Sequence, residues 1–102
     1  METINAISKV RFSSARPQTI QLHEAGDLAI ELLCMEPGQK AERRRAGQWA
    51  YYVITGTASV TSQGHDAKIS DGQLAASGPD EPHTIANTGQ QRLVCLSAGR
   101  VS

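Results

Sequence analysis

Turn-forming residues interrupt this chain every few positions, and that spacing limits what it can fold into. The turn signals are Ala25-Gly26-Asp27, Glu36-Pro37-Gly38, Thr55-Gly56-Thr57, Gln63-Gly64-His65-Asp66, Asp71-Gly72, Gly78-Pro79-Asp80 and Thr88-Gly89. The short apolar or alternating segments between them are typical of strands. We expect strands near residues 19–23, 28–36, 49–55, 58–62, 67–70, 73–76, 83–87 and 91–98. No long segment has a helical period, so we predict an all-β sandwich or barrel.

The composition fits a single small domain and excludes several classes of function. The chain has 102 residues, and its 10 Lys plus Arg balance 10 Asp plus Glu, so nothing attracts it to nucleic acid or to a membrane surface. It has no apolar run near the ~20 residues of a membrane span, and its N-terminus shows no signal peptide. We therefore expect a cytoplasmic protein in which Cys34 and Cys95 are buried free thiols.

The segment from Gly72 to Asn87 carries a spaced set of glycine, histidine and asparagine. Gly72, His83 and Asn87 occupy fixed places of the second motif of the cupin family, Gly-x5-Pro-x-Gly-x2-His-x3-Asn, which the segment resembles. Gly78 and Asp80 stand where the family has Pro and Gly. The resemblance covers residues 28–98. It implies a double-stranded β-helix, or jelly-roll, barrel of the cupin type, with His83 in the place of a metal ligand.

The first cupin motif, Gly-x5-His-x-His-x3–4-Glu-x6-Gly, is visible only as a frame. Gly38 and Gly56 fit its terminal glycines, but the interval between them is one or two residues short. Counted back from Gly56, the glutamate place holds Trp49 and the histidine places hold Glu42 and Arg44. Counted forward from Gly38, Arg44 again occupies a histidine place. Neither count leaves a histidine in this motif.

These substitutions remove most of the ligands that the resemblance implies. Three imidazoles and one carboxylate are the usual donors of a cupin metal site. Arginine has no lone pair to donate and repels a cation, and tryptophan offers only an N–H group. Only His83 and Glu42 are left, so we expect no cofactor and no transition metal. The alternative is a site rebuilt from His83 and Glu42 with Asp80 or Glu81.

Strand alternation predicts which side chains face the barrel interior. If Trp49 points inward, so do Tyr51 and Val53, and His83 shares one face with Ile85 and Asn87. The candidate ligand-binding residues are Arg44, Trp49, Tyr51, His83 and Glu42. Aromatic walls with a few polar groups suit a small molecule, and Arg44 favours an anion such as a carboxylate or phosphate. The competing interpretation is a packed core that Trp49 fills and in which Arg44 bonds a nearby carboxylate.

The basic run that contains Arg44 and the turn that contains Asn87 receive structural interpretations. Alternation places Arg43 and Arg45 on the face opposite Arg44, as part of a solvated loop or edge. Asn87 precedes a Thr88-Gly89 turn, where its amide is expected to bond neighbouring turn backbone. Residues 1–15 are expected to form an N-terminal arm or an edge strand of one domain spanning 1–102.

Three functions agree with this pattern. The first is a degenerate, metal-free cupin that binds a small organic molecule, with an anionic one as the candidate. The second is a metal-independent epimerase or isomerase in which His83 and Tyr51 act as base and acid. The third is a metal-dependent oxygenase or isomerase with a rebuilt site. We also expect a homodimer, because the sheet edges of a short chain need cover, with the N-terminal segment pairing across it.

Overall fold

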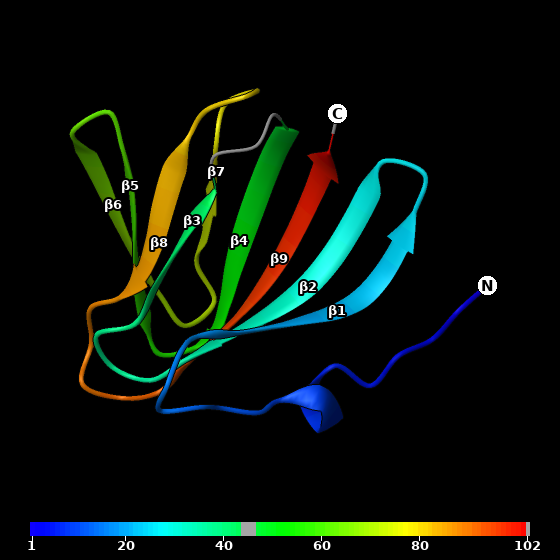
Figure 1. Ribbon diagram of the computed structural model, residues 1–102, viewed down its shortest axis with the longest axis horizontal. Helices are drawn as coiled ribbons and strands as arrows, with labels where there is room; N and C mark the ends of the chain where they lie inside the picture. The colour runs from blue at the N-terminus through cyan, green and yellow to red at the C-terminus, as the bar shows by residue number, and fades with distance from the viewer. Residues whose placement is uncertain (44–46, 102) are drawn as a thin grey trace.

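The computed structural model describes residues 1–43 and 47–101, which fold into two antiparallel β-sheets that face one another (Figure 1). In spatial order, sheet A consists of β1 (Gln18–Ala25), β2 (Leu28–Met35), β9 (Leu93–Val101), β4 (Gly47–Thr55) and β7 (Leu74–Ala76). Sheet B consists of β3 (Lys40–Arg43), β8 (His83–Asn87), β5 (Thr57–Ser62) and β6 (His65–Ser70). The prediction of an all-β, double-stranded β-helix fold is confirmed.

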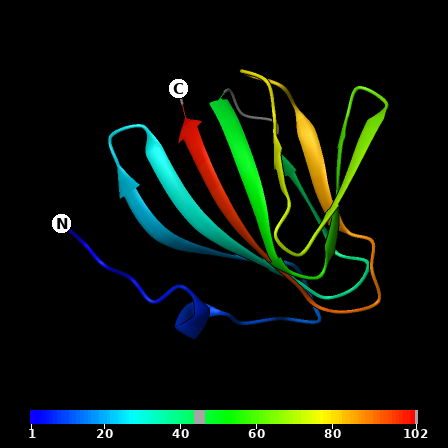
Figure 2. The same cartoon turned by 180° about the vertical axis from the view of Figure 1, so that it is seen from behind.

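The two sheets meet at one end of the molecule and diverge toward the other, as both views show (Figures 1 and 2). Two motif glycines serve the tight turns of this arrangement: Gly56 has a φ of 107° and Gly72 a φ of 81°. At Gly56 a Cβ would lie 2.7 Å from the backbone oxygen of Arg92, so a larger residue has no room. The frame glycines predicted from the motifs are therefore required by the backbone.

The sequence pattern does not predict β3, because this strand is short and three of its four residues are charged. It forms by pairing with β8, which places Ala41 opposite Ile85 and Arg43 opposite His83. Along the strand Lys40 and Glu42 are exposed while Ala41 and Arg43 are half-buried. The expectation that Arg43 faces away from the interior is therefore wrong.

Alternation along the central strands follows the sequence prediction. In β4 the side chains of Trp49, Tyr51 and Val53 are buried, and Tyr52 is exposed. In β8 the residues His83, Ile85 and Asn87 are buried and share a face. The main core lies between the sheets; its buried residues are Leu33, Met35, Trp49, Tyr51, Val53, Ala58, Ile69, Ile85, Leu93 and Cys95. The inward faces of the two sheets thus build most of the core.

A second apolar cluster lies on the outer face of sheet A, beneath the N-terminal segment. This segment forms a short 3-10 helix, η1 (Ile7–Lys9), and within the described residues it contains no strand. Its residues Ala6, Val10 and Phe12 pack against a cluster that contains Leu32 and Cys34. Cys34 and Cys95 are both buried and free, as expected, and they lie in different clusters. No helix among the described residues is long or apolar enough to cross a membrane.

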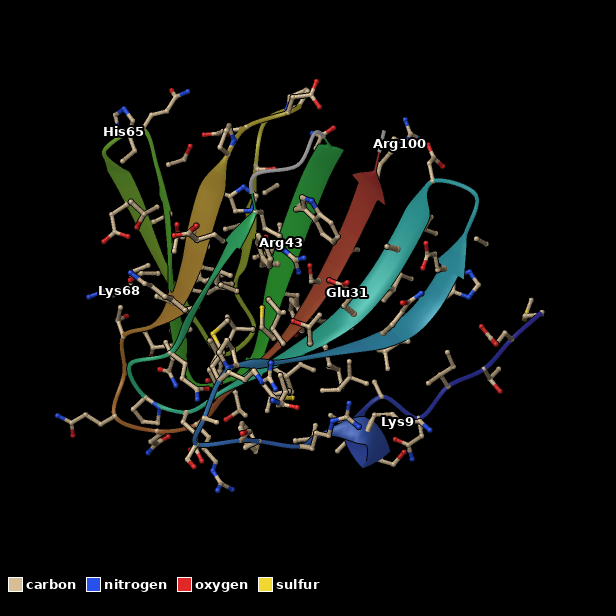
Figure 3. The ribbon with its side chains drawn as sticks, in the orientation of Figure 1. Lys9, Glu31, Arg43, His65, Lys68 and Arg100 are labelled. Atoms are coloured by element: carbon tan, nitrogen blue, oxygen red, sulfur yellow. The ribbon has the colours of Figure 1, made fainter. Side chains whose placement is uncertain are left out.

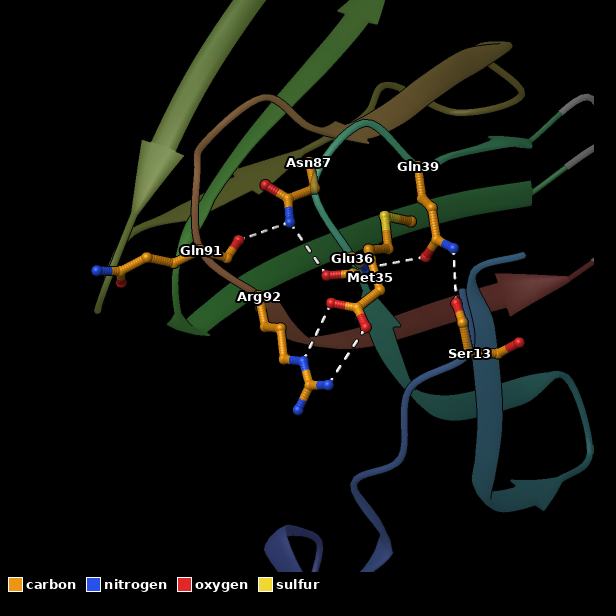
Figure 4. Close-up of polar contacts among 7 residues, drawn as sticks. All are labelled: Ser13, Met35, Glu36, Gln39, Asn87, Gln91 and Arg92. Carbon is orange, nitrogen blue, oxygen red and sulfur yellow. Dashed lines mark hydrogen bonds and ion pairs between the residues drawn. The ribbon is translucent and has the colours of Figure 1, made fainter. Parts of the chain in front are cut away.

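The end at which the sheets meet is fixed by a hydrogen-bond network around Asn87 (Figure 4). Its side-chain amide donates to the carbonyl oxygens of Met35, at 3.0 Å, and Gln91, at 2.8 Å. Its side-chain oxygen accepts from the N–H of Gly89 at 3.0 Å. Beside it, Arg92 makes two bonds to the carboxylate of Glu36. The prediction that Asn87 is structural and bonds turn backbone is confirmed.

Candidate functional site

One layer across the interior of the barrel contains five polar or charged residues, and we call it the polar layer. Its members are Glu31, Arg43, Tyr51, His83 and Ser97. On sheet A, Ser97 of β9 is paired with Glu31 of β2 on one side and with Tyr51 of β4 on the other. On sheet B, Arg43 of β3 is paired with His83 of β8. The strand register therefore brings together residues from five strands that are far apart in sequence.

Apolar rows lie on both sides of the polar layer. Toward the end where the sheets meet, the next row of sheet A is Leu33, Cys95 and Val53. Toward the end where they diverge, the next row is Ala29, Gly99 and Trp49. The ring of Trp49 lies across Gly99, where a Cβ would come within 2.3 Å of it. The polar layer thus lies between the apolar row of Leu33, Cys95 and Val53 on one side and the indole ring of Trp49 on the other.

Tyr51 and His83 are in direct contact inside this layer. The hydroxyl of Tyr51 lies 2.5 Å from Nε2 of His83, and their rings pack edge to face at a centroid distance of 5.4 Å. Nδ1 of His83 lies 2.8 Å from the carbonyl oxygen of Glu81. Because a carbonyl only accepts, Nδ1 carries a proton and donates to it; in the tautomer protonated at Nδ1 alone, Nε2 accepts from the hydroxyl of Tyr51.

The protonation of Tyr51 follows from its burial. Desolvation raises the pKa of Tyr51 to about 12, and the nearby positive charge of Arg43 offsets only part of that effect. The phenol is therefore uncharged at neutral pH and serves as the hydrogen-bond donor to His83. A buried tyrosine bonded in this way is a poor general acid unless something separates the pair.

Arg43 lies between the two sheets, near Glu31 (Figure 3), and it contacts both Glu31 and Trp49. Its Nη2 donates to Oε1 of Glu31 at 2.7 Å, and the two side chains are only 19% and 16% exposed. Its guanidinium carbon lies 4.3 Å from the centroid of the Trp49 ring, a cation–π distance. The Nε of Arg43 is buried and has no hydrogen-bond partner among the described residues.

Ser97 is the second polar group whose bonding is incomplete. The residue is fully buried at the centre of the sheet A row, and its Oγ also has no hydrogen-bond partner within residues 1–43 and 47–101. A buried hydroxyl or guanidinium N–H without a partner is unfavourable, and such groups in native proteins are usually met by a ligand or an ordered water. The polar layer therefore offers two groups that can still bind.

The structure brings together only part of the site expected from the sequence. Trp49, Tyr51 and His83 converge as predicted. Glu42 is exposed on β3 and does not belong to the polar layer, but together with His83 it lines a surface pocket of about 470 Å³, whose other lining residues come from β5, β8 and the adjoining loops. Arg44 lies outside the described residues, and Arg43 supplies the inward guanidinium.

Three members of the polar layer were not predicted, and two of them carry a signal in the sequence. Glu31 is the one charged residue in the strand Leu28–Met35, which is otherwise apolar, and a lone charge in such a strand requires a partner. Arg43 follows from alternation once β3 is known to be a strand. Ser97 has no comparable signal, because a serine in a strand is common.

The described residues do not fit a cupin-type metal site. Within this part of the chain no three His, Cys, Asp or Glu side chains are grouped so that they could hold a metal ion. Both ring nitrogens of His83 are engaged, one by Tyr51 and one by Glu81. Asp80 and Glu81 accept hydrogen bonds from the backbone N–H groups of Gly47 and Gly78, and so stabilise the loop before β8.

A model of the cupin domain matches residues 31–99, which include both motif regions and the polar layer. This chain belongs to the cupin family. The match covers most of the chain, and the sequence-based recognition of a small cupin with a degenerate first motif is confirmed at the level of the family. A search of curated protein sequences found no match.

Solved structures with the same fold agree with this assignment. The protein TT1209 from Thermus thermophilus superposes with a TM-score of 0.91 at 18% identity, over 99% of this cupin and 98% of that chain. A conserved double-stranded β-helix protein from Klebsiella pneumoniae gives 0.86 at 22% identity, over 99% and 90%. A proposed sugar phosphate isomerase from Acidithiobacillus ferrooxidans gives 0.63 at 26% identity, over 76% of this cupin and 52% of that chain. The first two establish the jelly-roll fold.

Proposed function

We propose that this cupin binds a small acidic organic molecule inside its barrel without a cupin-type metal. The observation that supports the proposal best is the inward guanidinium of Arg43, which donates once to Glu31 and keeps a buried Nε without a partner in the described chain. Arginine has several donors in a fixed geometry that matches carboxylate and phosphate oxygens. The adjacent ring of Trp49 provides an apolar surface for the remainder of the ligand.

Thermal unfolding in the presence of small acids tests this function. A ligand that binds only the folded state raises the melting temperature with its concentration. We expect at least one member of a panel of short carboxylates and phosphate esters to do so for the wild type and not for Arg43→Met. Arg100→Met is the matched control, because Arg100 is an exposed arginine paired with Asp27 at the surface. Equal stabilisation of both variants would place binding elsewhere.

Metal content tests the proposal that this cupin acts without a cupin-type metal. Protein purified without a tag or chelator should contain far less than one transition metal per chain by plasma mass spectrometry, and added Mn, Fe, Ni or Zn should leave that value unchanged. About one metal per chain, lost in His83→Ala, would favour an oxygenase or isomerase with a rebuilt site.

A second candidate function is a metal-independent isomerase, favoured by the contact between Tyr51 and His83. The similarity of this cupin to the proposed sugar phosphate isomerase gives one substrate class to test. Such an enzyme would exchange substrate hydrogen with deuterated water, and Tyr51→Phe would abolish the exchange. Because the two side chains bond one another in a buried layer, a substrate would have to separate them, so we place this function second.

We also propose a homodimer formed by the outer face of sheet A. Tyr52 and Leu74 are paired across β4 and β7 and are 42% and 60% exposed. Next to them, Ala50, Ala76 and Ala98 line part of a surface pocket of about 280 Å³. The large side chains project beside a pocket lined by small ones. Two copies related by a twofold axis can therefore each insert their large side chains into the pocket of the other. Light scattering should give twice the chain mass, and Leu74→Glu should halve it while Ile7→Glu, on η1, should not.

A further inference from the structure

The centre of the polar layer is Ser97, and its surroundings restrict what it can bind. The residue is flanked by Glu31 and Tyr51 on the neighbouring strands. It is fully buried, and its hydroxyl has no hydrogen-bond partner among the described residues. A hydroxyl can donate one hydrogen bond to an incoming acceptor.

Arg43 contributes the second available donor. One N–H of its guanidinium is used by Glu31, and the ring of Trp49 covers one of its faces. Its Nε–H is buried and has no partner in the described chain. The hydroxyl of Tyr51 does not add a third donor, because it already donates to His83. Among the buried side-chain atoms of this layer, the groups without a partner in the described chain are thus one N–H and one O–H.

The charge of the layer further limits the ligand. Arg43 is the only cation that faces the interior at this level within the described residues, and the carboxylate of Glu31 contacts it. A dianion such as a phosphate monoester would add two negative charges beside the carboxylate of Glu31, which already uses the positive charge of Arg43. A monocarboxylate adds only one negative charge, and its two oxygens can accept from Nε of Arg43 and Oγ of Ser97.

We infer that the ligand of this cupin presents a monocarboxylate, bound by Nε of Arg43 and Oγ of Ser97, and that these two groups determine its specificity. This inference rests on the proposed function, since it names the chemical class that the same site recognises. It selects carboxylates over phosphates, and over the corresponding amides, which lack the negative charge that strengthens a hydrogen bond from the guanidinium of Arg43.

The fluorescence of Trp49, the single tryptophan of the chain, reports on binding at this layer. Wild-type protein is titrated with acetate, butyrate and benzoate, with the amide of each, and with methyl phosphate and phenyl phosphate. We expect at least one carboxylate to change the emission saturably, and its amide and the matched phosphate to bind at least about tenfold more weakly.

Three variants separate specificity from folding. Ser97→Ala should weaken the carboxylate by about tenfold, and Arg43→Lys, which keeps the charge but lacks Nε, should weaken it similarly. Ser59→Ala is the matched control, because Ser59 is a buried serine that bonds Thr88 in sheet B. It should bind like the wild type. If Ser97→Ala does not fold, Ser97→Cys, which keeps the volume and donates weakly, takes its place.

The outcomes distinguish this inference from the proposed function. Saturable binding of a carboxylate that Ser97→Ala weakens and Ser59→Ala preserves supports both. A phosphate or an amide that binds as tightly as the carboxylate, or a Ser97→Ala variant that binds like the wild type, overturns the inference and leaves the function standing. The absence of binding by every acid, in fluorescence and in thermal unfolding, overturns both.

Discussion

This barrel contains two polar clusters, one around Asn87 where the sheets meet and the other in the polar layer, and they differ in how completely they are bonded. Around Asn87, where the sheets meet, both polar atoms of the side-chain amide are bonded to backbone groups. In the polar layer, Nε of Arg43 and Oγ of Ser97 have no partner among the described residues. A saturated network stabilises a fold, while an unsaturated one keeps the capacity to bind. The comparison assigns a structural role to the Asn87 network and a binding role to the polar layer.

The largest effect on stability is expected in the Asn87 network, where the hydrogen bonds are complete. Asn87→Ala removes three hydrogen bonds and leaves the carbonyls of Met35 and Gln91 without this donor. We expect a loss of about 3–4 kcal/mol in the free energy of unfolding. Chemical denaturation measures it, with Gln90→Ala as the control, because Gln90 is an exposed residue of the same loop. A loss below about 1 kcal/mol would show that the network does not stabilise this end.

A smaller loss of stability, with a change in the site, is expected from Gly99→Ala. The added Cβ would lie 2.3–2.6 Å from three ring atoms of Trp49, so the indole must move. We expect a loss of about 1–3 kcal/mol, as in other overpacked cores, and a red-shifted Trp49 emission. Ala98→Ser, on the outer face of the same strand, should leave the emission unchanged. An unshifted spectrum would mean that the ring does not lie across Gly99.

High pH should destabilise the protein through Tyr51. Its pKa is raised from 10.0 in the unfolded chain to about 12 in the fold, so between these values the folded state binds the proton more tightly. The stabilisation is therefore complete below pH 10 and is lost as the pH rises toward 12, by on the order of 2 kcal/mol.

Tyr51→Phe isolates this contribution. Urea unfolding at pH 8 to 11 should show a flatter alkaline decline for the variant than for the wild type. Tyr52→Phe is the control at the next position, where the side chain faces outward. Cys95, whose pKa burial also raises to about 12, contributes in the same direction and keeps some decline in both proteins. Identical slopes for wild type and Tyr51→Phe would contradict the buried, protonated phenol.

The smallest effect on stability is expected from Ser97→Ala. Removing a buried hydroxyl that has no partner in the described chain costs no hydrogen bond and removes a desolvated group. We expect the ligand-free protein to stay within about 1 kcal/mol of the wild type or to gain stability. Denaturation without added acid measures this. A loss of more than 2 kcal/mol would show that Ser97 belongs to a saturated network, and the contrast between the Asn87 network and the polar layer would disappear.

Much of the fold could be predicted because local chemistry determines it. Turn residues and alternation set the main strands, and the spacing of Gly56, Gly72, His83 and Asn87 indicated the cupin family. The inward set Trp49, Tyr51 and His83 followed from a side-chain period of two residues. The role of Asn87 followed from the turn behind it. Each of these inferences needs only residues that are close in the sequence.

The composition of the polar layer was decided by tertiary structure. Glu31, Ser97 and Tyr51 form a row only because β2, β9 and β4 are neighbours in a particular register, and a shift of one residue would send each to the opposite face. Arg43, which alternation from the sequence placed on the outer face, lies toward the interior because β3 pairs with β8, and the charges of β3 hide this strand in the sequence. The sequence by itself determined the main strands and the inward position of the aromatic residues Trp49 and Tyr51. Pairing between distant strands decided that Glu31 and Arg43 meet inside the barrel, because hydrogen-bond register depends on residues far apart in the chain.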